Sequence, residues 1–279
     1  YRDSRLHLVR NKYNVGLFGN FNCCLSLAQG KYLRFLCSDD KLIHGCLGRE
    51  IEIMNAYPNV VLLSTRGRRI DEAGRFLGMQ GDHFQSGIYF GHQAIHAVLW
   101  FQAHYAYNPL NYPSGILLRR EVALKTGQFD TTMRMSGDVD FFLRILEYGD
   151  LIVMDTLGCE IMIHTKQEGA QLTGDTAPML ELYALVERYR QLLEQAGTYP
   201  RIKQQLAAYA LGLGFKYWRI GLLDASRAHC KIVLNNGVHK LETVMPILRL
   251  LGLRLILKTT GIRLMPIHPS RSLRRDYAG

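Results

Sequence analysis

The chain has 279 residues, of which 48% are hydrophobic and 21% charged, and it carries a formal net charge of +10. This composition is that of a globular protein with one or two domains, and it excludes an intrinsically disordered chain. No apolar run reaches the roughly 20 residues that a membrane-spanning helix needs. Six cysteines without regular spacing predict reduced thiols rather than a disulfide framework.

The positive charge is concentrated in one part of the chain. Residues 1–179 contain 18 Lys or Arg and 18 Asp or Glu, whereas residues 180–279 contain 16 and 6. We therefore predict a domain of balanced charge at 1–178 and a basic helical region at 179–279 that faces an anionic partner.

The first part of the chain alternates between predicted strands and predicted helices. Strands are predicted at 5–11, 31–36 and 60–71, and helices at 19–30 and 47–57. This order predicts an open α/β sheet with crossover helices, in which ligands bind at the carboxyl ends of strands. The strand at 31–36 stops at Ser38-Asp39-Asp40, which puts two carboxylates at such an end.

The rest of the chain becomes progressively more helical. A helix is predicted at 92–105, a strand and a short helix at 116–130, a strong helix at 137–150, and one or two strands at 151–164. From about residue 180 the pattern is helical, with an amphipathic helix that ends at Gly197 and a helical pair at 199–221 and 223–237.

The adjacent carboxylates of Asp39 and Asp40 repel each other, so something nearby should compensate their charge. Mg²⁺ is usually held by one or two carboxylates together with substrate phosphates, and a turn at a strand end suits that purpose. Ser and Asp are also common helix starters, so a capping turn explains the same residues equally well. The turn alone does not decide between a metal ligand and a cap.

A second acidic pair, Asp138 and Asp140, lies in the first turn of the predicted helix at 137–150. Asp138 could act as a general base if it faces the same cleft as the carboxylate turn. A helix dipole also favours anions at this position, and taken alone this structural explanation is the more common one.

The motifs in this order resemble the inverting family 2 glycosyltransferases with the GT-A fold. The resemblance rests on Asn14, Gly16 and Asn20, then on Ala-x-Gly-x-Tyr at 28–32, and then on Asp39 and Asp40. It continues through the segments YPSGILLRRE, TGQFD, GDVDFFLR and IMIHTKQ and covers residues 5–171. It implies a GT-A-like open mixed sheet flanked by helices and followed by the C-terminal helical region.

The resemblance also implies a reaction. A sugar would pass with inversion from a UDP- or GDP-linked donor to a hydroxyl of a glycan or lipid-linked acceptor, in the synthesis of a cell-surface polysaccharide. Asp39 would hold a divalent metal, Mg²⁺ or Mn²⁺, and Asp138 would be the catalytic base. The implied substrate-binding residues are Asn14, Gly16, Asn20, Asp40, Arg144 and His164.

The chain departs from the family pattern at three places. Cys37 stands where a further Asp is common, and Gly137 stands where a Glu often precedes the base. The family also begins with a β-α-β segment that binds the nucleoside. This chain starts at the strand after that segment, so we expect an N-terminal truncation.

The basic region suggests where the protein works. Residues 240–265 combine apolar residues with Lys and Arg, which predicts contact with an anionic membrane surface. A helical domain with a solvated basic face is the alternative, and no nucleic-acid motif is present. We expect a cytoplasmic protein, peripheral at the inner face of the membrane. Two other functions stay open, a non-catalytic membrane-associated scaffold and a sugar nucleotidyltransferase.

Overall fold

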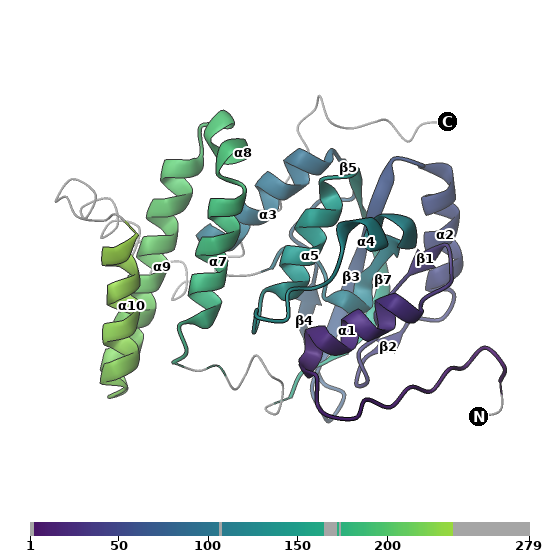
Figure 1. Ribbon diagram of the computed structural model, residues 1–279, viewed down its shortest axis with the longest axis horizontal. Helices are drawn as coiled ribbons and strands as arrows, with labels where there is room; N and C mark the ends of the chain where they lie inside the picture. Colours follow the sequence, from purple (N-terminus) through teal and green to yellow (C-terminus); the bar gives the residue numbers. More distant parts are fainter. Residues whose placement is uncertain (1–2, 106–107, 165–171, 173, 237–279) are drawn as a thin grey trace.

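The computed structural model describes residues 3–105, 108–164, 172 and 174–236. A β-sheet flanked by helices occupies one half of the molecule, and a helical region stands beside it (Figure 1). The strands are β1 Tyr32–Leu33, β2 Lys41–Leu42, β3 Val60–Ile70, β4 Phe76–Gln80, β5 Gly87–Tyr89, β6 Ile116–Arg119 and β7 Asp150–Met162. The α-helices are α1 Gly16–Leu27, α2 Cys46–Ala56, α3 Gly91–Tyr105, α4 Arg120–Thr126, α5 Gly137–Leu146, α7 Ala177–Arg188, α8 Arg190–Gln195, α9 Tyr199–Arg219 and α10 Leu223–Asn235.

The sheet is mixed, as predicted. Its strand order is β1-β6-β3-β7-β2, with β4 paired to β3 and β5 paired to β7. Among the described strands only β3 and β7 run parallel, in a register that puts Leu63 opposite Ile152. The long strands β3 and β7 therefore form the centre of the sheet, and the ends of β7 define two opposite edges of the molecule.

Alternate residues of the central strand β3 face two different cores, as the period of a strand requires. Leu62 belongs to the larger core, where α1, α3 and α5 cover the sheet. Leu63 belongs to a smaller core on the other face, where it packs with Met54 of α2. The first eight residues of β3 are all buried, because helices cover both faces of the strand at this point.

The larger core continues from the sheet into the helical region. It includes Phe142 of α5, Leu185 of α7, Leu206 of α9 and Ile232 of α10. The predicted boundary at residue 178 falls in the first turn of α7. An ion pair reinforces this contact, because the buried carboxylate of Asp140 accepts hydrogen bonds from Arg144 on its own helix and Arg188 on α7.

Several predicted elements differ from the structure. The strand predicted at 5–11 is wrong, since this segment has no strand and its Leu8 side chain is 99% exposed. Alternation without a pairing partner or a core to cover does not make a strand. Of the strand predicted at 31–36, only Tyr32 and Leu33 pair with β6. The helix predicted to end at Gly197 is divided at Tyr189 into α7 and α8.

Other predictions are confirmed. Helices α2, α3, α4, α9 and α10 lie where their apolar patterns predicted them, and α5 begins at Gly137 as expected but ends at Leu146. The six cysteines are free thiols. The segment 240–265 lies outside the described residues.

Gly137 is required by the close approach of α1 to the start of α5. A Cβ atom at this position would lie 2.6 Å from Cε2 of Phe18. Phe18 is itself held in an aromatic cluster, with its ring stacked on Phe129 at 6.0 Å and Phe129 stacked on Phe141 at 3.9 Å. The family position that often carries a Glu therefore has no room for a side chain here.

We expect Gly137→Ala to lower the free energy of unfolding by about 1–3 kcal/mol, because the added methyl group overpacks a rigid aromatic cluster. Phe18→Leu in the same chain should restore part of this loss, since the two sites are in contact. Urea unfolding measures both. The matched control is Gly48→Ala in α2, where nothing lies within 4 Å and Ala should stabilise the helix. Equal changes in the free energy of unfolding for Gly137→Ala and Gly48→Ala would contradict the explanation that a side chain at position 137 overpacks the aromatic cluster.

Candidate active site

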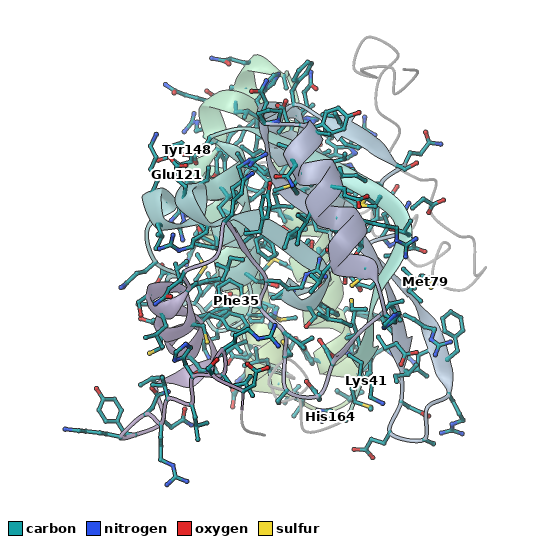
Figure 2. The ribbon with its side chains drawn as sticks, turned by 90° about the vertical axis from the view of Figure 1, so that its right-hand side faces the viewer. Phe35, Lys41, Met79, Glu121, Tyr148 and His164 are labelled. Carbon is teal, nitrogen blue, oxygen red and sulfur yellow. The ribbon has the colours of Figure 1, made fainter. Side chains whose placement is uncertain are left out.

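The carboxylate turn after β1 lies against the carboxyl end of β7. The backbone N–H of Met162 donates to Oδ1 of Asp40 at 3.1 Å, and Nε2 of His164 lies 3.0 Å from Oδ2 of Asp39. Figure 2 shows His164 beside Lys41 at one end of the molecule, far from Tyr148 and Glu121 at the other. The structure thus brings Asp39, Asp40 and His164 together, as the resemblance implied.

Asp40 is held by the protein on both of its carboxylate oxygens. Oδ1 accepts from Met162, and Oδ2 accepts from the hydroxyl of Ser114 at 2.6 Å. The same Ser114 oxygen accepts the backbone N–H of Cys37 at 3.1 Å, so it ties the two ends of the turn together. Burial raises the pKa of Asp40 despite these bonds. Its carboxylate mainly shapes the turn.

Asp39 keeps a more open position. Its side chain is 34% exposed, and its partner His164 is 22% exposed. A carboxylate beside an imidazole is a suitable donor pair for a divalent cation, provided that substrate phosphates complete the coordination. No cluster of three or more His, Cys, Asp or Glu with metal-binding geometry exists within the part of the chain that the structure describes. The role of Asp39 as metal ligand stays a prediction.

The thiol of Cys37 marks the point where three carboxylates converge. Its pKa is raised to about 11, mainly by burial and to a smaller extent by the negative charges of Asp40, Asp39 and Asp138, while the hydrogen bond with Ser114 lowers it. The thiol is therefore protonated at neutral pH and is not the thiolate that binds metals. The charges of both acidic motifs therefore act on this one thiol.

Asp138 lies in the first turn of α5, half-buried, at the wall of a cavity of about 400 Å³. Burial raises its pKa to about 6, although the N–H of Val139 donates to its Oδ1 at 2.8 Å. The charge of Glu181 adds a small upward contribution to this pKa. A carboxylate with a pKa near neutrality can both accept a proton and release it, as a general base must.

The helical region forms much of this cavity. Its apolar lining includes Met179 and Leu182 of α7 and Leu213 of α9, and its polar lining includes Gln102 of α3 and His229 of α10. The cavity therefore lies between the sheet domain and the helices that follow it.

Glu181 of α7 fixes the turn that precedes Asp138. Its carboxylate accepts the backbone N–H groups of Arg134 at 2.5 Å, Met135 at 3.1 Å and Ser136 at 2.8 Å. Three donors on one carboxylate leave the turn little freedom, so α7 determines where α5 begins.

The remaining predicted site residues have local partners. Oδ1 of Asn14 accepts the N–H of Gly16 at 2.9 Å, and Oδ1 of Asn20 accepts from Asn11 at 3.2 Å. Arg144 binds Asp140 at 2.9 Å and the carbonyl oxygens of residues 126 and 128 at 3.0 and 2.8 Å. These contacts give Arg144 a structural role, and the substrate-binding roles of these residues stay predictions.

Sequence reasoning missed four residues that border the site. Ser114 stood in the quoted YPSG segment, whose turn chemistry could have identified it. Glu181, Gln102 and His229 lie on ordinary amphipathic helices, and nothing in their local sequence distinguishes them from other helical polar residues.

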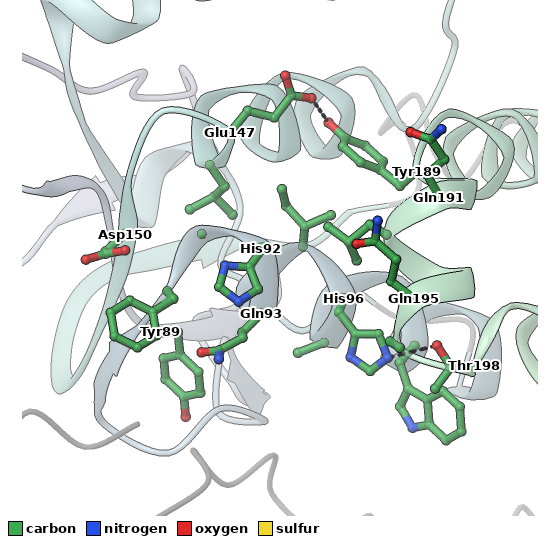
Figure 3. Close-up of a pocket in the computed structure, with 18 of the residues that line it drawn as sticks. Tyr89, His92, Gln93, His96, Glu147, Asp150, Tyr189, Gln191, Gln195 and Thr198 are labelled. Carbon is green, nitrogen blue, oxygen red and sulfur yellow. Dashed lines mark hydrogen bonds between the residues drawn. The ribbon is translucent and has the colours of Figure 1, made fainter. Parts of the chain in front are cut away.

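A larger cavity of about 1,200 Å³ lies at the opposite edge of the sheet, where β7 begins at Asp150 (Figure 3). Two pairs of its polar groups contact each other, since His96 lies 3.0 Å from the hydroxyl of Thr198 and Tyr189 donates to Glu147 at 2.6 Å. It contains none of the predicted site residues, so size alone does not locate the site.

Comparison with known proteins agrees with the motifs. Residues 1–121 match the description "Glycosyl transferase family 2". Over these residues the chain is similar to glycosyl transferase family 2. The predicted family and the α/β fold class are thereby confirmed, and the family match covers the carboxylate turn and Ser114.

Relatives of the family 2 region are distant. The chain is 29% identical over 144 residues to the uncharacterized protein MT1568 of Mycobacterium tuberculosis, covering 50% of this chain and 44% of the relative. It is 38% identical over 53 residues to the Escherichia coli UDP-Glc:alpha-D-GlcNAc-diphosphoundecaprenol beta-1,3-glucosyltransferase WfaP, covering 19% and 21%. The chain thus spans less than half the length of either relative.

Among solved structures, the chain is similar to S. aureus TarS 1-349, with a TM-score of 0.44 and 12% identity over 82% of this chain and 74% of that one. A second S. aureus TarS structure gives a TM-score of 0.40 and 11% identity, and the match covers 76% of this chain and 42% of that one.

We expect Glu181→Ala to lower the free energy of unfolding by about 2–4 kcal/mol, since it leaves three backbone donors without their acceptor. Urea unfolding at neutral pH measures the loss. The matched control is Glu194→Ala in α8, whose exposed carboxylate binds only Arg190 among the described residues and should cost less than about 1 kcal/mol. Similar losses in the two variants would contradict the anchoring role of Glu181.

Proposed function

We propose that the chain carries the catalytic part of a glycosyltransferase that moves a sugar from a nucleotide-diphosphate donor to an acceptor hydroxyl with inversion. The observation that supports this most directly is the pairing of Asp39 with His164 at 3.0 Å beside the end of β7, together with Asp138 at the wall of a cavity of about 400 Å³. Asp39, which is partly exposed, could bind the metal and the donor. Asp138, at the cavity wall, could act on the acceptor. The family match over residues 1–121 supports the same reaction class.

On the donor side, Asp39 and His164 would hold Mg²⁺ or Mn²⁺ together with the diphosphate. When bound, such a metal offsets the charge of the departing nucleotide. The half-exposed position of Asp39 leaves room for this ligand, and the protonated Cys37 thiol takes no part in it.

On the acceptor side, Asp138 would take the proton of the attacking hydroxyl. Its pKa of about 6 leaves it mostly ionised at neutral pH and still basic enough to pull on a hydroxyl proton. The bond from Val139 and the fixed turn held by Glu181 would keep the carboxylate in one orientation. Preorganisation of this kind is what makes a general base effective.

The relatives suggest which substrates to test first. The name of the E. coli relative gives UDP-Glc as donor and a diphosphoundecaprenol-linked GlcNAc as acceptor. A UDP-linked sugar and a lipid-linked acceptor are therefore our first candidates for this chain, in the synthesis of a cell-surface polysaccharide.

We expect Asp138→Asn to reduce transfer from UDP-Glc to GlcNAc-diphosphoundecaprenol by about 10²–10⁴-fold, because the amide cannot accept the proton. In the parent protein kcat/KM should fall as the pH drops below about 6, since protonation removes the base. Asp39→Ala should instead weaken metal-dependent binding of UDP-Glc.

The control is Asp224→Asn, at the same first-turn position of α10 but with a fully exposed side chain. It should leave the rate of transfer and the binding of UDP-Glc unchanged. Full activity of Asp138→Asn would refute the assignment of the base. Formation of UTP and glucose 1-phosphate from UDP-Glc and pyrophosphate would favour the sugar nucleotidyltransferase instead.

A surface at the α9–α10 turn supports the predicted membrane contact. Phe215 and Trp218 are 52% and 59% exposed, and their rings stack at 5.7 Å. Ile220, Leu222 and Leu223 extend the same surface, and Lys216 and Arg219 flank it. Aromatic and basic side chains together are typical of proteins that lie on anionic bilayers. No helix of the described residues is long and apolar enough to span a membrane.

We expect the double variant Phe215→Ser/Trp218→Ser to bind vesicles of phosphatidylcholine and phosphatidylglycerol at least about tenfold more weakly than the parent, because it loses the apolar contact. Co-sedimentation measures the binding. The control is Phe76→Ser/Leu77→Ser, an exposed apolar pair on β4. Equal binding by the two variants would exclude this surface, and binding without any transfer by the parent would favour the scaffold.

A further inference from the structure

Two side chains that line the cavity beside Asp138 each carry a buried polar atom with no hydrogen-bond partner among the described residues. These are Oε1 of Gln102 and Nε2 of His229, and both side chains line the cavity. Gln102 is 8% exposed and His229 is 0% exposed. Buried polar atoms are almost always paired, and each unpaired one costs about 1–3 kcal/mol. Two such atoms at one cavity indicate that something else normally satisfies them.

The ring of His229 is oriented by its other nitrogen. Nδ1 lies 2.8 Å from the carbonyl oxygen of Ala225 one turn earlier on α10. A carbonyl only accepts, so Nδ1 carries a proton, and in this tautomer Nε2 presents a lone pair that can accept a hydrogen bond. The ring also packs against Tyr217 at 5.1 Å, which limits its rotation.

Both orphaned atoms are therefore acceptors, and this determines the chemistry of a ligand. A phosphate or carboxylate, which offers only acceptor oxygens, would meet two lone pairs and be repelled. A neutral molecule with hydroxyl groups offers the missing donors. The apolar side chains of Met179, Leu182 and Leu213 suit the C–H face of a sugar ring, and the cavity volume of about 400 Å³ is within the usual range of ligand pockets.

We propose that Gln102 and His229 bind two hydroxyl groups of the acceptor sugar and so position a further hydroxyl at Asp138. The inference rests on the proposed function, because Asp138 lines the same cavity. It assigns acceptor recognition to α3 and α10, which lie outside the matched family region or near its end. Donor binding at Asp39 and His164 does not depend on it.

The test is a binding measurement that needs neither donor nor turnover. The full chain, labelled with ¹⁵N-histidine, is titrated with the methyl glycosides of N-acetylglucosamine, glucose, galactose and mannose, and separately with inorganic phosphate. We expect at least one glycoside to shift the His229 Nε2 resonance saturably, because a lone pair that accepts a hydrogen bond changes its shielding. Phosphate should leave the resonance unchanged, and His96, in the other cavity, is the internal control.

Gln102→Leu should weaken binding of that glycoside by roughly tenfold, the effect of one lost hydrogen bond to a buried group. Gln102→Met, which keeps the shape of the side chain, serves if the Leu variant does not fold, as judged by its unfolding curve. Asp224→Asn, whose side chain is fully exposed at the start of α10, should bind the glycoside as the parent does.

No shift with any of the four glycosides, a shift with phosphate, or unchanged affinity in both Gln102 variants would overturn the proposal. Normal glycoside binding with no transfer activity in the parent protein would instead count against the proposed function alone.

Discussion

The hydrogen bonds of Asp40 are the contacts on which the site depends. By accepting from Ser114 on one oxygen and from Met162 on the other, this carboxylate joins the turn after β1 to the end of β7 and to the segment before β6. Only with the turn fixed in this way can the neighbouring Asp39 meet His164. The repulsion expected between adjacent carboxylates is thus resolved by unequal environments: one is buried and fully bonded, and the other remains near solvent.

The acidic residues of the site differ in their surroundings rather than in their chemistry. Asp140 is buried between two arginines and holds helices together. Asp138, two residues earlier, has no basic partner among the described residues and has its pKa raised by burial. A group paired with Arg stays ionised and structural, whereas an unpaired one at a cavity wall is free to exchange a proton. In the first turn of α5, Asp140 therefore has the structural role, and the role of Asp138 as general base stays a proposal.

Sequence could predict the parts of this protein that are encoded locally. The helix at Gly137 and the pair α9 and α10 follow from their apolar spacing. The order of motifs singled out Asp39 and His164, but their contact at 3.0 Å became visible only in the structure. What escaped prediction depends on distant partners. The segment 5–11 has the alternation of a strand but no neighbour to pair with, and Glu181 acts on a turn 45 to 47 residues away. Gln102 and His229 are noteworthy only because the tertiary structure leaves them unpaired at one cavity.

The contacts of α7 have a consequence for how such a chain can change over evolution. Glu181 and Arg188 both reach from this helix into α5, one to the backbone before it and one to the carboxylate within it. Replacing the helices that follow the sheet would leave the buried carboxylate of Asp140 without Arg188. It would also leave three backbone N–H groups before α5 without their acceptor. The two halves therefore do not behave as independent modules, and any change in the helical region has to preserve these contacts with α5.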